Sequence, residues 1–436
     1  MKKFALQFMA VVAPVTVSFA SPAYEEPPTV RAADLVPKDM LSGPKFTVDP
    51  KVRTDGAMGV FRIHSEFGDF ECVGHEMLYK RIDEIRALGE VEKVSRTKAV
   101  FDALGKAALE PVKAAEKIVR HPVRSIVETP VGVARFLWMI VSAAGDAGNG
   151  LAHLAKPDHS KPGHPKPPPS RDDPIGYNDA RDVWARKLAV DPYTTNRKLA
   201  VKLNHLAMIS FGTDKVAGAG LGVGVGYIGE VGEWLSWLPD FDERILTAPP
   251  PDQRAINARK LATLGVTKPE TKRLLDNPWM TPPLQTRFVN GLTRLKGARN
   301  PEAMIELAGT VDSEEQAHFL CRSVELLAHY HEKVAPLRAL RAYSGVPAGV
   351  TANGTLVAAE SADLLAWTKP TAELARWRES GSGRSVLLVT GPLTKRAGQG
   401  FASRGWRVKE TPPDIFSQPA HHPKWRIRLT GHGSGS

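Results

Sequence analysis

Two cysteines and two histidines are the residues of this sequence whose types and spacing most clearly suggest chemistry. Cys72 and His75 are separated by two residues, and His318 and Cys321 repeat that gap in reverse order. Such a gap allows one turn of the chain to present two ligands to one ion, and two cysteines with two histidines form a tetrahedral zinc set. The pattern therefore offers a site for zinc or copper built from Cys72, His75, His318 and Cys321.

Three other interpretations of these residues stay open. The two cysteines are the only ones in the chain, so Cys72 and Cys321 could form one disulfide in an oxidising compartment. Each cysteine also suits burial as a small apolar side chain, and each histidine suits an ordinary helix position. Glu315 and His318 have the Glu-x-x-His spacing of di-iron bundles, but the second pair that such a site needs is not apparent in the sequence.

A glycine-rich run provides a second candidate site. Residues 224–229 match the pattern Gly-x-Gly-x-x-Gly, but no predicted strand precedes them, so no dinucleotide cofactor is expected. Gly218, Gly222 and Gly226 recur at every fourth position, which lets neighbouring helices approach closely. This spacing favours a packed segment, with a membrane-active hairpin as the alternative.

The C-terminal part of the chain provides a third candidate site. Val386–Thr390 and Trp406–Val408 are predicted strands, and 394–404 is a predicted helix between them. In open parallel sheets, ligands bind beyond the carboxyl ends of the strands, near the N-termini of helices. Thr368 and Thr390-Gly391 lie at such positions, and Thr394 is a suitable cap for the helix that follows.

The elements that would hold these residues are predicted to be mostly helical. An extended lead-in over 24–56 precedes a hairpin of 59–64 and 70–73, and an apolar stripe from Leu78 to Val91 predicts a helix after it. Near the C-terminus, 364–368 is a further predicted strand and 370–379 a further helix. The fold class expected is mainly α with an N-terminal β-hairpin and a small C-terminal α/β (βαβαβ) unit. The expected segments are a signal peptide at 1–23, a hairpin plus helical domain at 24–155, a proline-rich linker at 156–174, a helical domain at 175–340, an α/β unit at 341–410 and a flexible tail at 411–436.

The first residues have the three parts of a bacterial signal peptide. Lys2 and Lys3 form a basic start, Phe4–Phe19 is a short apolar run, and Ala20 and Ala23 each end a small-residue cleavage site. The run is shorter than the roughly 20 apolar residues of a comfortable membrane span. The sequence therefore predicts export to the periplasm or beyond it.

Charge and the missing catalytic motifs guide the functional interpretation. The chain has 58 Lys and Arg against 47 Asp and Glu, a net charge of +11. An exported basic protein meets anionic membrane or an envelope partner rather than nucleic acid. The sequence contains no Gly-x-Ser-x-Gly elbow and no P-loop. We therefore expect a non-catalytic envelope protein that uses basic amphipathic helices around 98–154, with a metal-binding protein or an enzyme based on the C-terminal α/β unit as the alternative.

Three segments resemble a family of exported proteobacterial proteins of unassigned function. They read FGDFECVGHEMLYKRIDEIRAL, VDPYTTNRKLAVKLNHLA and VLLVTGPLTKRAGQGFASRGWRV. The resemblance rests on the general character of the sequence, not on a catalytic motif, and would cover most of the mature chain. It implies residence in the periplasm and a mostly helical build with a small α/β end. It implies no catalytic or binding residues.

Overall fold

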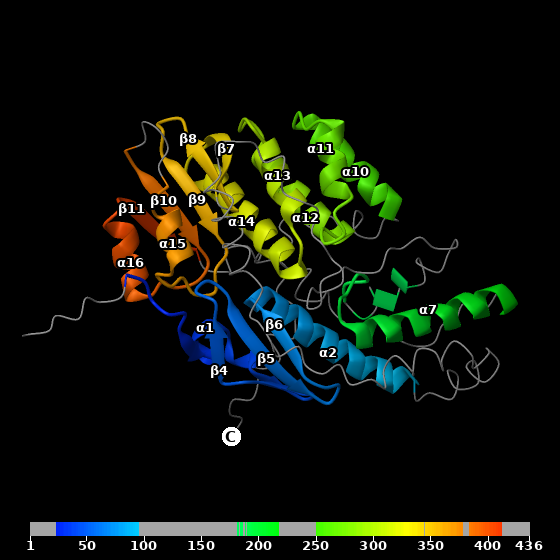
Figure 1. Ribbon diagram of the computed structural model, residues 1–436. Coiled ribbons are helices and arrows are strands. Elements are labelled where there is room, and N and C mark those ends of the chain that lie inside the picture. The colour runs from blue at the N-terminus through cyan, green and yellow to red at the C-terminus, as the bar shows by residue number, and fades with distance from the viewer. Residues whose placement is uncertain are drawn as a thin grey trace, which may run out of the picture.

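The protein is built from two β-sheets and a set of helices that meet along one long helix, α2 (Figure 1). The computed structural model describes residues 23–95, 181–217 without 183, 186, 187 and 189, 250–343, 345–377 and 383–411. About 47% of the structure is helix and 22% is strand. The expectation of a mainly α fold is therefore wrong. Four of the strands that it missed have only two to four residues each, so their alternation of polar and apolar residues extends over too few positions to be recognised.

The N-terminal sheet has six antiparallel strands in the order β1-β4-β5-β3-β2, with β6 paired to the other edge of β5. Four of these strands and the helix α1 (Ala32–Leu35) lie where an extended lead-in was expected, so that expectation is wrong as well. The missed strands have two to four residues each. The six strands are β1 (Thr29–Arg31), β2 (Ser42–Gly43), β3 (Phe46–Val48), β4 (Lys51–Thr54), β5 (Gly59–Ser65) and β6 (Phe70–Val73).

The predicted hairpin is confirmed as β5 and β6. Phe61 pairs with Cys72 and Ile63 pairs with Phe70, and the side chains of these residues lie on the face of the sheet that packs against the core. Helix α2 (His75–Ser95) covers this interior with the predicted apolar stripe, whose residues Leu78 to Val91 are buried. Helix α7 (Arg197–Ala217) packs along α2 on its other side (Figure 1).

A layer of helices covers one face of the C-terminal sheet. Helix α11 begins with a capping box in which Thr267 accepts from the Glu270 amide and the Glu270 carboxylate accepts from the Thr267 amide. Helix α14 packs against α12 on one side and against β8 and β9 on the other. The helices are α10 (Pro250–Thr263), α11 (Lys268–Leu275), α12 (Pro282–Arg294), α13 (Glu302–Thr310) and α14 (Glu314–Lys333).

The C-terminal sheet has five strands in the order β11-β10-β9-β8-β7. Strands β7, β8 and β9 form an antiparallel meander, whereas β9, β10 and β11 are parallel. Val357 and Ala359 pack against the α14 side, and Leu356 and Ala358 pack against the side of α15 and α16, so helices cover both faces. The elements are β7 (Leu337–Tyr343), β8 (Val346–Thr351), β9 (Leu356–Glu360), α15 (Lys369–Leu374), β10 (Ser385–Val389), α16 (Lys395–Ala402) and β11 (Trp406–Glu410).

The predictions for this end of the chain were partly right. Strands β10 and β11 and helix α16 are confirmed within two residues at each end. The strand predicted over 364–368 is wrong, because the strand parallel to β10 is 356–360 and 364–368 is a loop with one isolated bridge, between Leu365 and Leu393. Helix α15 ends at Leu374, earlier than predicted.

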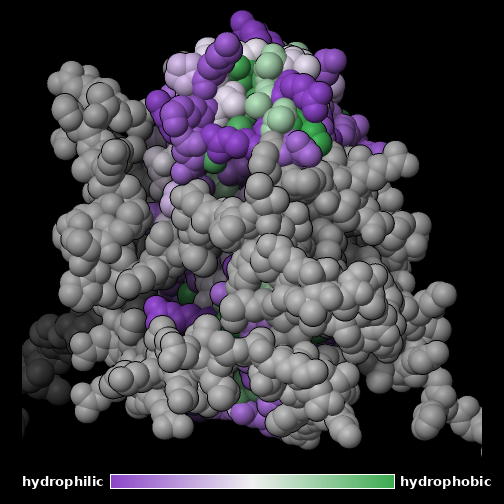
Figure 2. All heavy atoms as spheres, turned by 90° about the vertical axis from the view of Figure 1, so that its right-hand side faces the viewer, coloured by the Kyte–Doolittle hydropathy of each residue, from purple (hydrophilic) through white to green (hydrophobic). Residues whose placement is uncertain are grey.

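Several predicted segments lie outside the described residues. These are the signal peptide, the helices around 98–154, the linker at 156–174 and the glycine-rich run after 217. Within the part of the chain that the structure describes, no helix has the length and apolar character needed to cross a bilayer. On the face seen in Figure 2, the coloured residues of the helical layer are mostly hydrophilic, with small hydrophobic areas between them.

Candidate functional site

The two cysteines do not meet in the structure. Cys72 lies on β6 in the core beneath α2, whereas Cys321 lies on α14 in the core of the helical layer. Both are free, buried thiols, so the structure does not contain the disulfide that the sequence left open. Burial raises the pKa of Cys72 to about 12 and raises that of Cys321 as well, which keeps both side chains in the thiol form.

The two histidines of the predicted metal set have carboxylate partners. The ring Nδ1 of His75 contacts Asp363, and the ring Nδ1 of His318 lies 3.1 Å from a carboxylate oxygen of Glu76. Among the described residues, no group of three or more His, Cys, Asp and Glu side chains is placed to hold a metal ion. The zinc or copper site therefore stays a prediction, which metal analysis of the purified protein would test.

The threonines of the α/β unit have structural partners. Thr394 caps α16 by accepting from the Ala397 amide, as predicted, and the Thr390 hydroxyl donates to the Ala362 carbonyl over 2.7 Å. Thr368 precedes α15 without a side-chain cap. Thr390 directly follows β10 and so lies at the carboxyl edge of the parallel strands. The contacts of Asp363 with Gly59 and His75 place this edge beside the N-terminal sheet and the start of α2.

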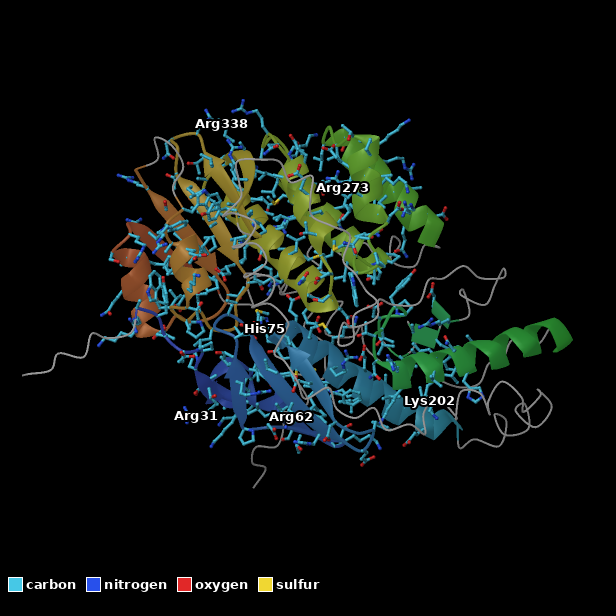
Figure 3. The ribbon with its side chains drawn as sticks, viewed as in Figure 1. Arg31, Arg62, His75, Lys202, Arg273 and Arg338 are labelled. Carbon is cyan, nitrogen blue, oxygen red and sulfur yellow. The ribbon has the colours of Figure 1, made fainter. Side chains whose placement is uncertain are left out.

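At this edge the C-terminal α/β unit is joined to the unit formed by the N-terminal sheet and α2, and the carboxylate of Asp363 lies at the centre of the contact. It accepts from the amides of Gly59 (2.8 Å) and His75 (3.2 Å) and contacts the His75 ring, while its own amide donates to the Ala57 carbonyl. Figure 3 places His75 between the two units. Gly56 completes the contact at φ +101°, where an added Cβ would lie 2.5 Å from the Thr368 side chain. Only glycine fits there without strain. We call this contact the junction, defined by residues 55–59, His75 and 360–363.

Glu360 is the most unusual ionisable group of the junction. It ends β9, its residue is 1% exposed, and its Oε2 has no hydrogen-bond partner among the described residues. Burial, with a further contribution from the negative charge of Asp55, raises the pKa of Glu360 to about 8. Asp55 is half-buried, and its Oδ1 accepts from the amides of Ala57 and Met58. The junction therefore holds a carboxylic acid that keeps its proton near neutral pH, close to a second carboxyl group.

A buried ion cluster fixes the start of α2 beside the junction. Arg287 on α12 reaches Glu76 on α2 (3.0 Å) and Glu325 on α14 (2.6 Å), using both edges of its guanidinium. Arg322 also approaches both carboxylates, and His318 contacts Glu76. Despite burial, which favours the neutral acid, Arg287 and His318 hold the pKa of Glu76 well below its usual range. We call these residues the Arg287 cluster.

A second cluster, centred on Lys80, binds the chain segment around residue 191. Lys80 is buried between Asp191 (2.5 Å) and Glu314, and the Thr195 hydroxyl donates to the same glutamate. Burial alone would raise the pKa of Glu314, but Lys80 and Arg81 lower it to about 2. This cluster explains why VDPYTTN, a segment without regular structure, is held against α2 and α14.

The sequence contained a usable signal for part of this site. Glu360 and Asp363 follow the apolar residues of β9 directly, which is where a parallel strand presents ligand-binding side chains. That strand was predicted eight residues too late, so neither residue was identified as a candidate. Asp55, Glu76 and Arg287 come from remote parts of the chain, and only the tertiary fold brings Asp55 to the junction and joins Glu76 to Arg287 beside it.

Comparison with known proteins adds no functional assignment. No protein-family model, no curated protein and no solved structure matches the chain. The resemblance to an exported proteobacterial family therefore stays an expectation, and the function has to be inferred from the junction itself.

Proposed function

We propose that the protein is an exported hydrolase that uses Glu360 and Asp55 as its acid–base pair. The observation that carries this proposal is the Glu360 side chain, which is buried at the carboxyl edge of the sheet and whose Oε2 has no hydrogen-bond partner within the described part of the chain. A buried polar atom without a partner is costly, so such a group is often retained for function. The half-buried Asp55 marks the side from which a substrate would reach the pair.

The chemistry suited to this pair is cleavage of a bond that needs one proton donor and one carboxylate. Two carboxyl groups whose environments push their pKa values apart provide these two roles. Protonated Glu360 would donate its proton to the leaving oxygen as the glycosidic bond breaks. The Asp55 carboxylate would take a proton from a water molecule whose oxygen forms the new bond to the same sugar carbon, as in glycoside hydrolysis. An envelope polysaccharide is the substrate class that an exported protein of this type would meet. This proposal adopts the enzymatic alternative based on the C-terminal α/β unit.

The other junction residues would act as positioning residues. Asp363 ties the Gly59 and His75 amides to the end of β9, which fixes the loop carrying Asp55 relative to Glu360. The Arg287 cluster holds the first turn of α2, and therefore His75, against α14. A catalytic pair needs such support because small displacements of the reacting groups reduce the rate strongly.

The proposal predicts a loss of hydrolytic activity in Glu360→Gln and Asp55→Asn. Removing a general acid typically lowers the rate by about 10²- to 10⁴-fold. The assay is release of reducing ends from purified envelope polysaccharides. Because only protonated Glu360 can donate, wild-type activity should fall as the pH rises above about 8. Glu373→Gln, on α15 and outside the junction, is the matched control and should retain full activity. Equal activity of all four proteins, or none in any of them, would refute a hydrolase of this type.

A second proposal is that the protein binds an anionic envelope surface through its charge. It is supported by the net charge, which is +11 for the full chain and +9 once Lys2 and Lys3 are removed with the predicted signal peptide. On the described surface, Val334, at 51%, is the one large hydrophobic side chain that is exposed. Binding should therefore be electrostatic rather than apolar. We expect the mature protein to sediment with vesicles containing anionic phospholipid at low salt and to be released by about 0.5 M salt. Equal binding to vesicles of zwitterionic lipid would contradict it.

A further inference from the structure

Four exposed cations, which we call the basic patch, lie at one edge of the C-terminal sheet. They are Lys296, Arg299, Lys333 and Arg338. The Arg299 amide donates to the Arg338 carbonyl over 2.9 Å, which places these two residues side by side on extended chain. Arg338 is the second residue of β7, and β7 begins at the edge where β9 and β10 begin, opposite to the junction at the end of β9. Figure 3 shows Arg338 at the top of the view and His75 near its centre.

The ends of two helices bring the lysines of the basic patch to this edge. Arg294 makes a bidentate contact with Glu332 (3.0 and 2.6 Å), which joins the last turns of α12 and α14. Lys296 follows Arg294 by two residues, and Lys333 follows Glu332 directly. Arg299 lies only three residues beyond Lys296, so the helix ends and the edge of the sheet form one continuous surface.

The charge of the basic patch is not neutralised by the described residues. None of its four side chains forms an ion pair with a described carboxylate. The segments 294–302 and 331–338 contain five cations and two carboxylates, and one of these carboxylates, Glu332, is already paired with Arg294. Cations at the C-termini of helices stabilise those helices. This effect explains the two lysines but not the two arginines, because the arginines lie on extended chain.

An exposed apolar side chain lies within the basic patch. Val334, directly after Lys333, is 51% exposed, whereas no aromatic side chain of the described residues is exposed. The patch therefore offers no platform on which nucleic-acid bases would stack. Lipid phosphates need only cations near the surface, and an apolar side chain beside the cations enters the boundary between headgroups and acyl chains. The composition of the patch thus matches an anionic lipid surface.

We propose that the basic patch docks the protein onto an anionic phospholipid membrane, with Val334 entering between the headgroups. This inference rests on the second function proposed above, for which it names the contact surface and the lipid phosphate as the ligand. The patch and the junction lie at opposite edges of the C-terminal sheet. A docked protein therefore holds the junction on the side away from the membrane.

Sedimentation with vesicles of phosphatidylglycerol and phosphatidylcholine in equal parts tests this surface in the mature protein. The patch variant combines Lys296→Gln, Arg299→Gln, Lys333→Gln and Arg338→Gln, and it should bind at least about tenfold more weakly, since each cation near an anionic surface adds to the attraction. The matched control combines Lys38→Gln, Lys51→Gln, Lys369→Gln and Lys395→Gln, four exposed lysines outside the patch, so both variants have the same net charge. The control should stay within about threefold of the wild type, because distant charges are screened.

The outcomes separate this surface from the function on which it rests. Equal weakening of the two variants, or wild-type binding by the patch variant, would overturn the basic patch and leave electrostatic binding to the membrane standing. Absence of binding by the wild type would overturn both. Tighter patch-dependent binding to a soluble acidic polysaccharide, polygalacturonate, than to the vesicles would overturn the membrane as the partner.

A fluorophore at residue 334 reports the contact independently of charge. Val334→Cys can be labelled selectively, because the two native thiols, Cys72 and Cys321, are buried. The emission of an environment-sensitive label at this position should shift to the blue when the vesicles are added, whereas the same label on Lys51→Cys should not change. An unchanged emission at residue 334 while the labelled protein sediments with the vesicles would overturn the proposed contact.

Discussion

The wild-type protein should lose stability as the pH rises from about 4.5 to 8, and replacing Glu360 by glutamine should remove much of this pH dependence. The pKa of this carboxyl is raised from 4.5 to about 8, first by burial and then by Asp55, so the folded state binds a proton that the unfolded state releases. The stabilisation is complete below the unfolded pKa and disappears as the pH rises through the folded pKa. The change corresponds to as much as about 5 kcal/mol.

The measurement is urea unfolding of wild type and Glu360→Gln at about pH 5, 6.5 and 8. Glu315 contributes in the same direction, because burial and the neighbouring Glu314 raise its pKa as well. Glu315→Gln is therefore the second variant, and the slope that survives in the double variant reports all other groups. If wild type and Glu360→Gln lose stability in parallel over this range, Glu360 is ionised in the folded protein and the proposed acid is wrong.

Replacing Arg287 by methionine should destabilise the protein by about 3–5 kcal/mol. Arg287 is 3% exposed at its side chain and is the main partner of two buried carboxylates, Glu76 and Glu325, which would keep only their weaker contacts with Arg322 and His318. Burying an uncompensated charge is expensive, whereas removing the charges together is often nearly neutral. Adding Glu76→Gln should therefore restore a large part of the loss, because the remaining carboxylate, Glu325, keeps Arg322 as its cationic partner. Free energies of unfolding from urea titrations measure both effects.

Arg294 provides the matched control for this substitution. It lies two turns after Arg287 on the same helix and also makes a bidentate contact, with Glu332, but its side chain and that of its partner are 16% and 33% exposed. Pairs near the surface contribute about 0–1 kcal/mol, so Arg294→Met should have a small effect. If Arg287→Met and Arg294→Met lower the free energy of unfolding equally, burial is not the reason why the Arg287 cluster stabilises the protein.

The sequence predicted the elements whose periodic pattern is long enough to be unambiguous. The stripe from Leu78 to Val91 defines α2, and the alternation of Phe61 and Ile63 defines β5 and its inner face. The apolar run at β10 is flanked by turn residues, so its position was also correct.

The missed elements have local sequences that do not reveal their structure. Strand β9 reads LVAAE, whose alanines have no strand preference, while the neighbouring LLAWT has the more strand-like side chains. Leu356–Glu360 forms the strand because its tertiary contacts are better, since this segment pairs with both β8 and β10.

The candidate site was harder to predict than the fold, because charged residues were expected at the surface. Glu76 and Lys80 lie on α2 at positions that, by composition alone, belong to a solvated face. They are buried because α2 is covered on more than one side, by the N-terminal sheet and by α14. No local pattern indicates that second contact. The cysteine–histidine spacing predicted a metal site instead. In the structure, His75 contacts Asp363 after β9, and His318 contacts Glu76 on α2.

The protonation state of Glu360 can be observed directly. Infrared difference spectroscopy of wild type against Glu360→Gln isolates the carbonyl stretch of this one carboxylic acid. We expect a protonated-acid band at about pH 7 that is absent from the variant and titrates away near pH 8. A carboxylate band at about pH 7, with titration in the ordinary range of a glutamate near pH 4.5, would contradict it.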